Sequence, residues 1–291
     1  MLGNSNIEFS KPKNRFGLQS RLQFWAVLAL ILALTPGQTV AQITSSNTSP
    51  AVSGGAGATV NENADIVIGS GGNGTVTVDG VGTTLNATEN GVSPTEDGLI
   101  IVGGDGGTGD LNIQNNGTVN ITADGVGSTD AHLRISDGSF GSSQQGTVTL
   151  NNGTLNLSSE NETSLLGVGR RGHGVINATN STINLSTASA VDSSVLHVGG
   201  SSSIDGDAGT FGEVTLTNTT LTLSNTNASG TGANSISVGR NTNSAIAEGS
   251  RPLNTLVVQS GSTITLSAIP TFGVPRVGDD LRSGRRSKQN R

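Results

Sequence analysis

Paired carboxylates are the first candidates for catalytic residues, because a glycosidase needs two carboxyl groups about 5–10 Å apart around the scissile bond. Asp205 and Asp207 form such a pair, two residues apart in a Gly- and Ser-rich insertion. Most other acidic residues fall in expected turns, where contact with solvent explains them; among these are Asp105, Asp110, Asp124, Asp130 and Asp137. Solvation is also the better explanation of the pair itself, so we predict no catalytic residues.

Metal sites have little support in the sequence. The stretch 106–111, GGTGDL, is similar to the calcium-binding repeat GGxGxDxUx. It lacks the residue between the last glycine and Asp110, and it occurs once. His132, His173 and His197 fall before a strand, in a loop and inside a strand of successive repeats, so their side chains should not stack. With no cysteine in the chain, we predict neither a metal site nor a cofactor.

The cluster Gly167–Gly169 precedes two basic residues, Arg170 and Arg171. Glycine-rich phosphate sites open a helix, and no helix is expected here. A turn is the better interpretation of the glycines. Exposed arginines could contact sulfated or sialylated glycans, although such a pair is more often solvated.

A repeat of three short strands positions all of these residues. Alternating apolar and polar residues, as in Gly146–Ser158 (GTVTLNNGTLNLS), indicate half-buried strands. Six units run from Ile66 to Ser267. Their first strands are 66–69, 100–104, 133–138, 165–169, 195–200 and 236–239; their second strands are 74–78, 109–113, 146–150, 174–178, 212–216 and 255–258; their third strands are 82–88, 117–122, 153–158, 181–186, 219–224 and 261–267. Gly69, Ser136, Gly169, Gly199 and Gly239 align where the first strand closes, with a spacing of about 30–40 residues.

Turns too short for crossover helices predict an all-β fold, a parallel β-helix of about six coils with three strands per coil. Each strand should pair with its counterpart in the next unit, about 4.8 Å away. We expect two rows of inward-facing side chains to form the structural core: Val76, Leu111, Val148, Ile176, Val214 and Leu256; and Leu85, Val119, Leu155, Ile183, Leu221 and Ile264. The alternative is an antiparallel β-sandwich, because the Asn-Asn-Gly turn is also typical of hairpins.

The N-terminal segment, residues 1–41, is typical of a secretory signal peptide. A cationic region precedes the apolar run Trp25–Leu34, and small residues lead to a cleavage site after Ala41. The run is too short for a confident membrane span, so no integral span should remain after cleavage. Residues 42–64 are expected to be a leader or N-terminal cap, 65–268 the repeat domain, and 269–291 a basic, disordered tail.

The composition narrows the classes of function. A net charge of −6 at pH 7 provides no basic patch for nucleic acid. Aromatic residues make up 2 % of the chain, too few for the core of an ordinary globular domain. Regular alternation of β-branched and polar residues argues against disorder. A repetitive β-protein fits best.

Three units carry a resemblance to a known family: 66–88, 100–122 and 165–186 (LLGVGRRGHGVINATNSTINLS). They resemble the repeats in passenger regions of bacterial type V secretion (autotransporter) proteins. The resemblance covers about 65–268. It implies a right-handed parallel β-helix at the surface of, or released from, a Gram-negative cell, most often in adhesion. Such proteins also carry a C-terminal translocator barrel, which this sequence lacks.

These observations predict a non-enzymatic surface or secreted repeat protein, outer membrane-associated or extracellular, that adheres through extended polar faces. Its partner would be a host or environmental glycan or protein surface, or a second copy bound through the strand edges. The first alternative is a polysaccharide-processing β-helix lyase or hydrolase, with its site in the insertions 201–210 and 241–252. The second is a truncated passenger without a present function.

Overall fold

The structure, a computed structural model, describes residues 41–89, 98–104, 106–123, 130–137, 144–199, 211–227, 232–239 and 253–268. The predicted signal peptide before Ala41, Asp105, Asp124, the Asp205–Asp207 pair, the insertions 201–210 and 241–252, and the tail 269–291 lie outside these residues. All the regular structure described is β-strand, without helices. The described residues therefore include no helix long and apolar enough to span a membrane.

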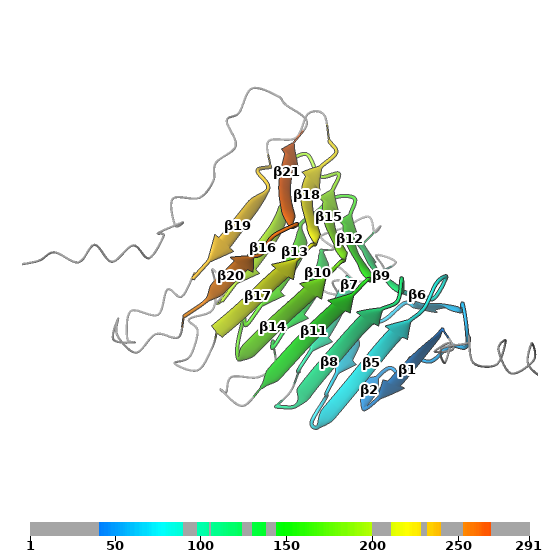
Figure 1. Ribbon diagram of the computed structural model, residues 1–291. Helices are drawn as coiled ribbons and strands as arrows, with labels where there is room; N and C mark the ends of the chain where they lie inside the picture. Colours follow the sequence, from blue (N-terminus) through cyan, green and yellow to red (C-terminus); the bar gives the residue numbers. More distant parts are fainter. Residues whose placement is uncertain are drawn as a thin grey trace, which may run out of the picture. The chain divides into compact units, whose positions relative to one another are not determined.

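The strands form three sheets, which we name A, B and C (Figure 1). Sheet A contains β1 (Gln42–Ser46), β5 (Asn73–Asp79), β8 (Thr108–Gln114), β11 (Gln145–Asn151), β14 (His173–Thr179), β17 (Phe211–Thr217) and β20 (Thr255–Val258). Sheet B contains β2 (Thr48–Ser49), β4 (Ile66–Ile68), β7 (Gly98–Val102), β10 (Ala131–Ile135), β13 (Ser164–Val168), β16 (Ser194–Val198) and β19 (Ser235–Val238). Sheet C contains β3 (Thr59–Glu62), β6 (Thr84–Glu89), β9 (Thr118–Ala123), β12 (Thr154–Ser159), β15 (Thr182–Thr187), β18 (Thr220–Asn225) and β21 (Thr263–Ala268).

From β4 onward the chain visits sheets B, A and C in turn, and each strand pairs in parallel with its counterpart one coil away. This is a right-handed parallel β-helix, with six coils of three strands from β4 to β21, as predicted. A right-handed connection is the rule where parallel strands follow one another in a sheet. The alternative prediction, an antiparallel β-sandwich, is wrong. Asn152, in the turn that suggested a hairpin, instead has a φ of 55° at the corner between sheets A and C.

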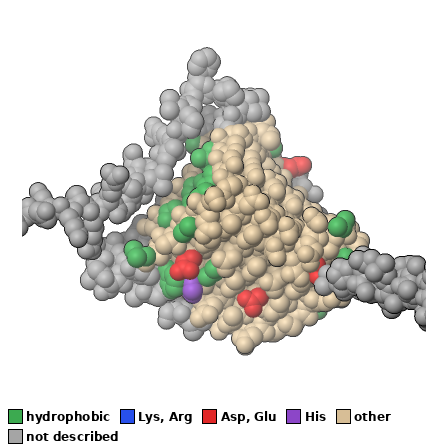
Figure 2. Space-filling model, viewed as in Figure 1, with side chains coloured by type: hydrophobic (Ala, Val, Ile, Leu, Met, Phe, Trp, Pro, Cys, Tyr) green, Lys and Arg blue, Asp and Glu red, His purple; other side chains and the backbone are tan. Residues whose placement is uncertain are grey.

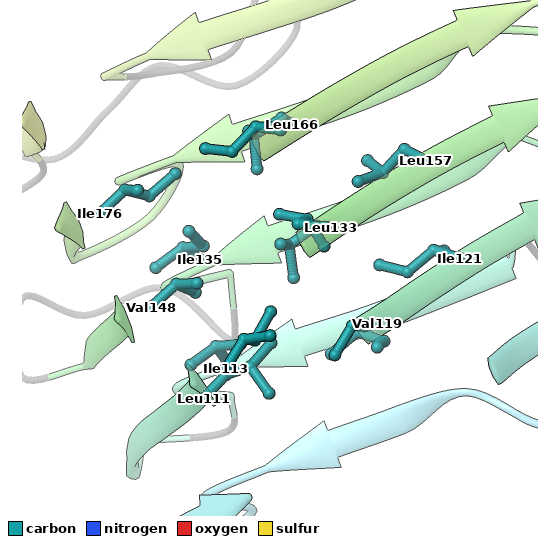
Figure 3. Close-up of a cluster of buried hydrophobic side chains, with 14 of the residues drawn as sticks. Leu111, Ile113, Val119, Ile121, Leu133, Ile135, Val148, Leu157, Leu166 and Ile176 are labelled. Atoms are coloured by element: carbon teal, nitrogen blue, oxygen red, sulfur yellow. The ribbon is translucent and has the colours of Figure 1, made fainter. Parts of the chain in front are cut away.

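The core is built from stacked rows of aliphatic side chains (Figure 3). Strand pairing places the residues of both predicted rows next to one another in the predicted order, from Val76 to Leu256 and from Leu85 to Ile264. The members in the first five coils are at most 1 % exposed. Leu256 and Ile264, in the last coil, are only partly buried.

The two ends of the stack differ. At the N-terminal end β1 pairs with β5 and β2 pairs with β4, both antiparallel, while β3 pairs in parallel with β6. Ile43 and Val52 are 1 % and 0 % exposed and cover the apolar interior there. The segment expected to be a leader or cap therefore contains antiparallel strands, which the repeat pattern does not predict. β1 begins at Gln42, directly after the predicted cleavage site.

Candidate functional site

The outer face of sheet C is uncharged and polar throughout the described strands. Outward positions there are half-buried or exposed, and each of them is Thr, Ser or Asn. They are Thr59, Asn61, Thr84, Asn86, Thr88, Thr118, Asn120, Thr122, Thr154, Asn156, Ser158, Thr182, Asn184, Ser186, Thr220, Thr222, Ser224, Thr263, Thr265 and Ser267. We call this set face C. β-Branched threonine has a restricted χ1 angle, so its hydroxyl and methyl groups hold fixed directions.

Hydrogen bonds between asparagines join face C along the stack. Asn86 Nδ2 donates to Asn61 Oδ1 at 2.7 Å, and Asn120 Nδ2 donates to Asn86 Oδ1 at 2.8 Å. Asn156 and Asn184 continue the row, at 2.8 and 2.9 Å. Asn86, Asn120 and Asn156 are each held by an asparagine in the coil before and in the coil after. Face C is therefore preorganised across coils.

The outer face of sheet A is also polar but carries charge. Asp110 lies between Thr75 and Thr147 in register, and Glu213 lies beside Val175. Figure 2, viewed as Figure 1, shows mostly uncharged polar side chains and backbone on this side, with isolated acidic groups. Face C and the outer face of sheet A therefore differ in charge, although both are rich in threonine.

The outer face of sheet B combines apolar and charged side chains. Leu99, Ile101, Leu165 and Val195 occupy outward positions on β7, β13 and β16. On β10 the outward positions carry charge-bearing groups instead. They belong to a charged cluster, which we define as Asp130, His132, Arg134, Asp137, Arg170 and Arg171.

Asp137 lies at the centre of the charged cluster. Its carboxylate is 4 % exposed and is surrounded by three guanidinium groups. Arg170 Nη1 donates to Asp137 Oδ2 at 2.9 Å, while the Nε atoms of Arg134 and Arg171 lie 3.6 and 3.5 Å from its oxygens. The predictions of a solvated turn aspartate and of an exposed arginine pair are therefore wrong. Asp137 follows β10 and the arginine pair follows β13, at the same corner of successive coils.

Ser136 provides the turn that places Asp137. Its φ is 61°, in the left-handed region where Gly103 and Gly169 stand in the neighbouring coils. The Ser136 hydroxyl donates to the carbonyl of Gln144 at 3.0 Å. Ser136 therefore occupies a position that is glycine in the neighbouring coils, and its side-chain hydrogen bond stabilises this turn.

His132 lies inside β10 rather than before it, which corrects the predicted position. Arg134 Nη2 lies 2.7 Å from His132 Nδ1, and His132 Nε2 lies 3.1 Å from Asp130 Oδ2. Because a guanidinium only donates, Nδ1 must accept, and the ring proton belongs on Nε2. Both ring nitrogens are engaged, so His132 is poorly placed to act as a general base or metal ligand.

The three histidines occupy different rows of the stack. His132 is level with Leu165, and His197 is level with Gly167. His173 stacks on Phe211, with ring centroids 3.8 Å apart. Within the described ranges, no three His, Cys, Asp or Glu side chains gather as a metal site would need.

Two further sequence motifs have structural roles in the described residues. Gly107 and Gly109 lie against the backbone of Gly69 and Gly103, where an added Cβ atom would overlap the Gly69 carbonyl oxygen and the Gly103 nitrogen. In Gly167–Gly169, the φ of Gly169 is 72° and a Cβ would meet the Phe211 carbonyl. Close backbone approach explains these glycines without a ligand.

A carboxylate group that the sequence interpretation missed lies at the corner before sheet B. Burial, then the charge of Asp192, then that of Asp130, raises the pKa of Glu162, and a hydrogen bond with Asp192 adds to the shift. Glu162 and Asp192 stand two residues before β13 and β16, so aligning the repeats would have placed them together. Carboxyl groups in direct contact leave no room for the sugar between a glycosidase pair.

We compared the chain with protein-family models, with curated proteins and with solved structures. None of the three comparisons finds a match.

Proposed function

We propose that the chain is an exported surface or secreted repeat protein, similar to an autotransporter passenger, that adheres to another surface through face C. The observation that carries this proposal is the unbroken set of Thr, Ser and Asn side chains on the outside of sheet C. Binding would be spread over many coils, as on other solenoid surfaces. No catalytic step is part of the proposal.

The chemistry of face C favours a neutral partner. Without charged side chains, the face offers no ion pairs to an acidic or basic partner. Its hydroxyl and amide groups both donate and accept hydrogen bonds, which suits the hydroxyl groups of a polysaccharide. Because the face repeats every coil, a partner that also repeats can make the same contact many times.

Export is supported by the N-terminal sequence, and the described strands are compatible with cleavage after Ala41. The apolar run Trp25–Leu34 and the small residues before Gln42 are typical of a secretory signal. Cleavage after Ala41 would leave β1 complete, since that strand starts at Gln42.

The test is co-sedimentation of the chain with insoluble neutral polysaccharides, cellulose and chitin, and with acidic pectin as a comparison. We expect binding to a neutral particle and a weakening of about tenfold in Thr154→Lys, which places an ammonium group in the middle of face C. Thr154 is half-buried between Thr118 and Thr182.

Thr147→Lys is the matched control, because Thr147 is equally half-buried in the same coil but on sheet A. It should bind as the parent does. Equal losses in the two variants, or parent chain that stays in solution with both neutral particles, would contradict adhesion through face C.

A further inference from the structure

Among the described residues, the last coil of the stack leaves its apolar interior partly exposed. In the last coil Ile236, Val238 and Leu256 are only partly buried, although the residues before them in their rows are at most 1 % exposed. Val258 and Leu266, also at inward positions, are 46 % and 37 % exposed. Val257, on the outside of the same strand, is 42 % exposed. This end therefore presents an aliphatic surface to solvent.

The same end also presents unpaired strand edges. β19, β20 and β21 are the last strands of sheets B, A and C, and among the described strands each pairs on one side only. Such an edge offers a row of backbone N–H and C=O groups to another strand. The end face is thus an apolar patch framed on three sides by hydrogen-bonding edges.

The N-terminal end cannot complement this surface. The antiparallel strands β1 and β2 lie there, and Ile43 and Val52 already close the interior. Stacking of one copy's C-terminal end on another's N-terminal end would therefore join an open interior to a closed one. The surface that does match an open C-terminal end is a second open C-terminal end.

A two-fold axis makes this match geometrically possible. Rotation by 180° about the normal of sheet A reverses its strand direction, returns sheet A to itself and exchanges sheets B and C. β20 then meets β20 of the second copy in antiparallel pairing, and β19 meets β21. Inward side chains remain inward, so the two aliphatic interiors become one. Such an isologous contact closes at two copies and cannot continue into a fibre.

We propose that two copies of the chain associate through their C-terminal ends by this pairing. The edge strands contribute four, four and six residues from each copy. That is fewer than the 20–30 residues a side of a standard interface. The dimer should therefore be weak, with a dissociation constant on the order of micromolar. This association is independent of adhesion through face C.

The test compares two lysine variants of the full chain by sedimentation velocity over a range of concentrations. Val258→Lys would bury an ammonium group from each copy in the joined interior and should weaken association about tenfold or more. Val257→Lys is its matched control, because the two valines are adjacent in β20 and similarly exposed. In about 0.5 M salt it should weaken association by less than about threefold, because its ammonium group stays in solvent and the repulsion between the two facing lysines is screened. Circular dichroism checks that both variants keep the parent's β-structure.

Crosslinking gives a second measurement that does not depend on a destabilising change. The chain has no cysteine, so a crosslink through a single introduced cysteine can form only at that position. With a short bismaleimide, Val257→Cys should form covalent dimers, while Thr77→Cys, in the same outward row on β5, should not. A monomeric parent at about 100 µM, association of Val258→Lys equal to that of the parent, or equal crosslinking of the two thiols would each overturn the proposal.

Discussion

At the scale of single residues, environment rather than residue type decides what the aspartates do. Asp110 and Asp137 both belong to Gly-rich stretches of the sequence, yet Asp110 faces outward on sheet A while Asp137 is 4 % exposed among three arginines. The arginine that donates to Asp137 is 33 positions away in the chain. The sequence indicates that Arg170 is the partner of Asp137 only when the repeats are aligned.

We expect Asp137→Asn to destabilise the fold, because the amide leaves three half-buried guanidinium groups without their carboxylate. Complete loss of one partner of a buried ion pair costs about 3–5 kcal/mol. Since the arginine side chains are 18–27 % exposed, we expect about 2 kcal/mol after solvent screening. Urea unfolding measures this loss. Asp110→Asn should change the free energy of unfolding by less than about 0.5 kcal/mol, and equal losses would contradict the role of the cluster.

The pKa of Glu162 predicts a pH dependence of stability. Because burial and the neighbouring carboxylates raise this pKa above the ordinary glutamate value of 4.5, the folded state binds the proton more readily than the unfolded chain. The stabilisation that comes from protonated Glu162 is therefore fully present below the pKa of the unfolded chain. It is lost as the pH rises through the higher pKa of the folded state. Relative to Glu162→Gln, the parent should gain stability as the pH falls from 7 towards 4.5. Thermal unfolding of both proteins across that range checks it; a constant difference would contradict the shift.

At the scale of the strand, alternation predicts both the faces and the neighbours. Val148 and Thr149 are adjacent in sequence, and the fold buries the first and leaves the second half-exposed. Period-two alternation is enough to decide this, because neighbouring side chains point to opposite faces. The rows follow from the repeat, since the sequence alone aligns each strand with its sibling in the next unit.

Val148→Asp should cost about 4 kcal/mol or more, because it places an unpaired charge in the aliphatic core. Thr149→Asp should change stability by about 0.5 kcal/mol, since its neighbours in register are Asn112 and Asn177 on the outer face. Chemical denaturation of the two variants makes the comparison. A similar loss at both positions would refute the assignment of the inward face.

At the scale of the whole molecule, the repeat predicts the fold but not its ends. The six coils are predicted by the sequence repeat. β1 and β2 have no counterparts in the repeat, and they pair antiparallel with β5 and β4. Nothing in the alternation of Ile43 to Ser46 indicates the direction of its partner. The charged cluster escapes prediction for a related reason. Asp137, Arg170 and Arg171 each look solvated within their own turn, although the coil repeat makes those turns neighbours.

The asparagine row also gives face C a direction. From Asn184 to Asn61 each side-chain N–H points to the amide oxygen of the preceding coil, so the amide dipoles add head to tail towards the closed N-terminal end. Aligned hydrogen bonds polarise one another. A polysaccharide chain is itself directional, with chemically different ends. Two opposite placements of such a chain along face C would therefore differ in energy, and adhesion through this face would orient what it holds.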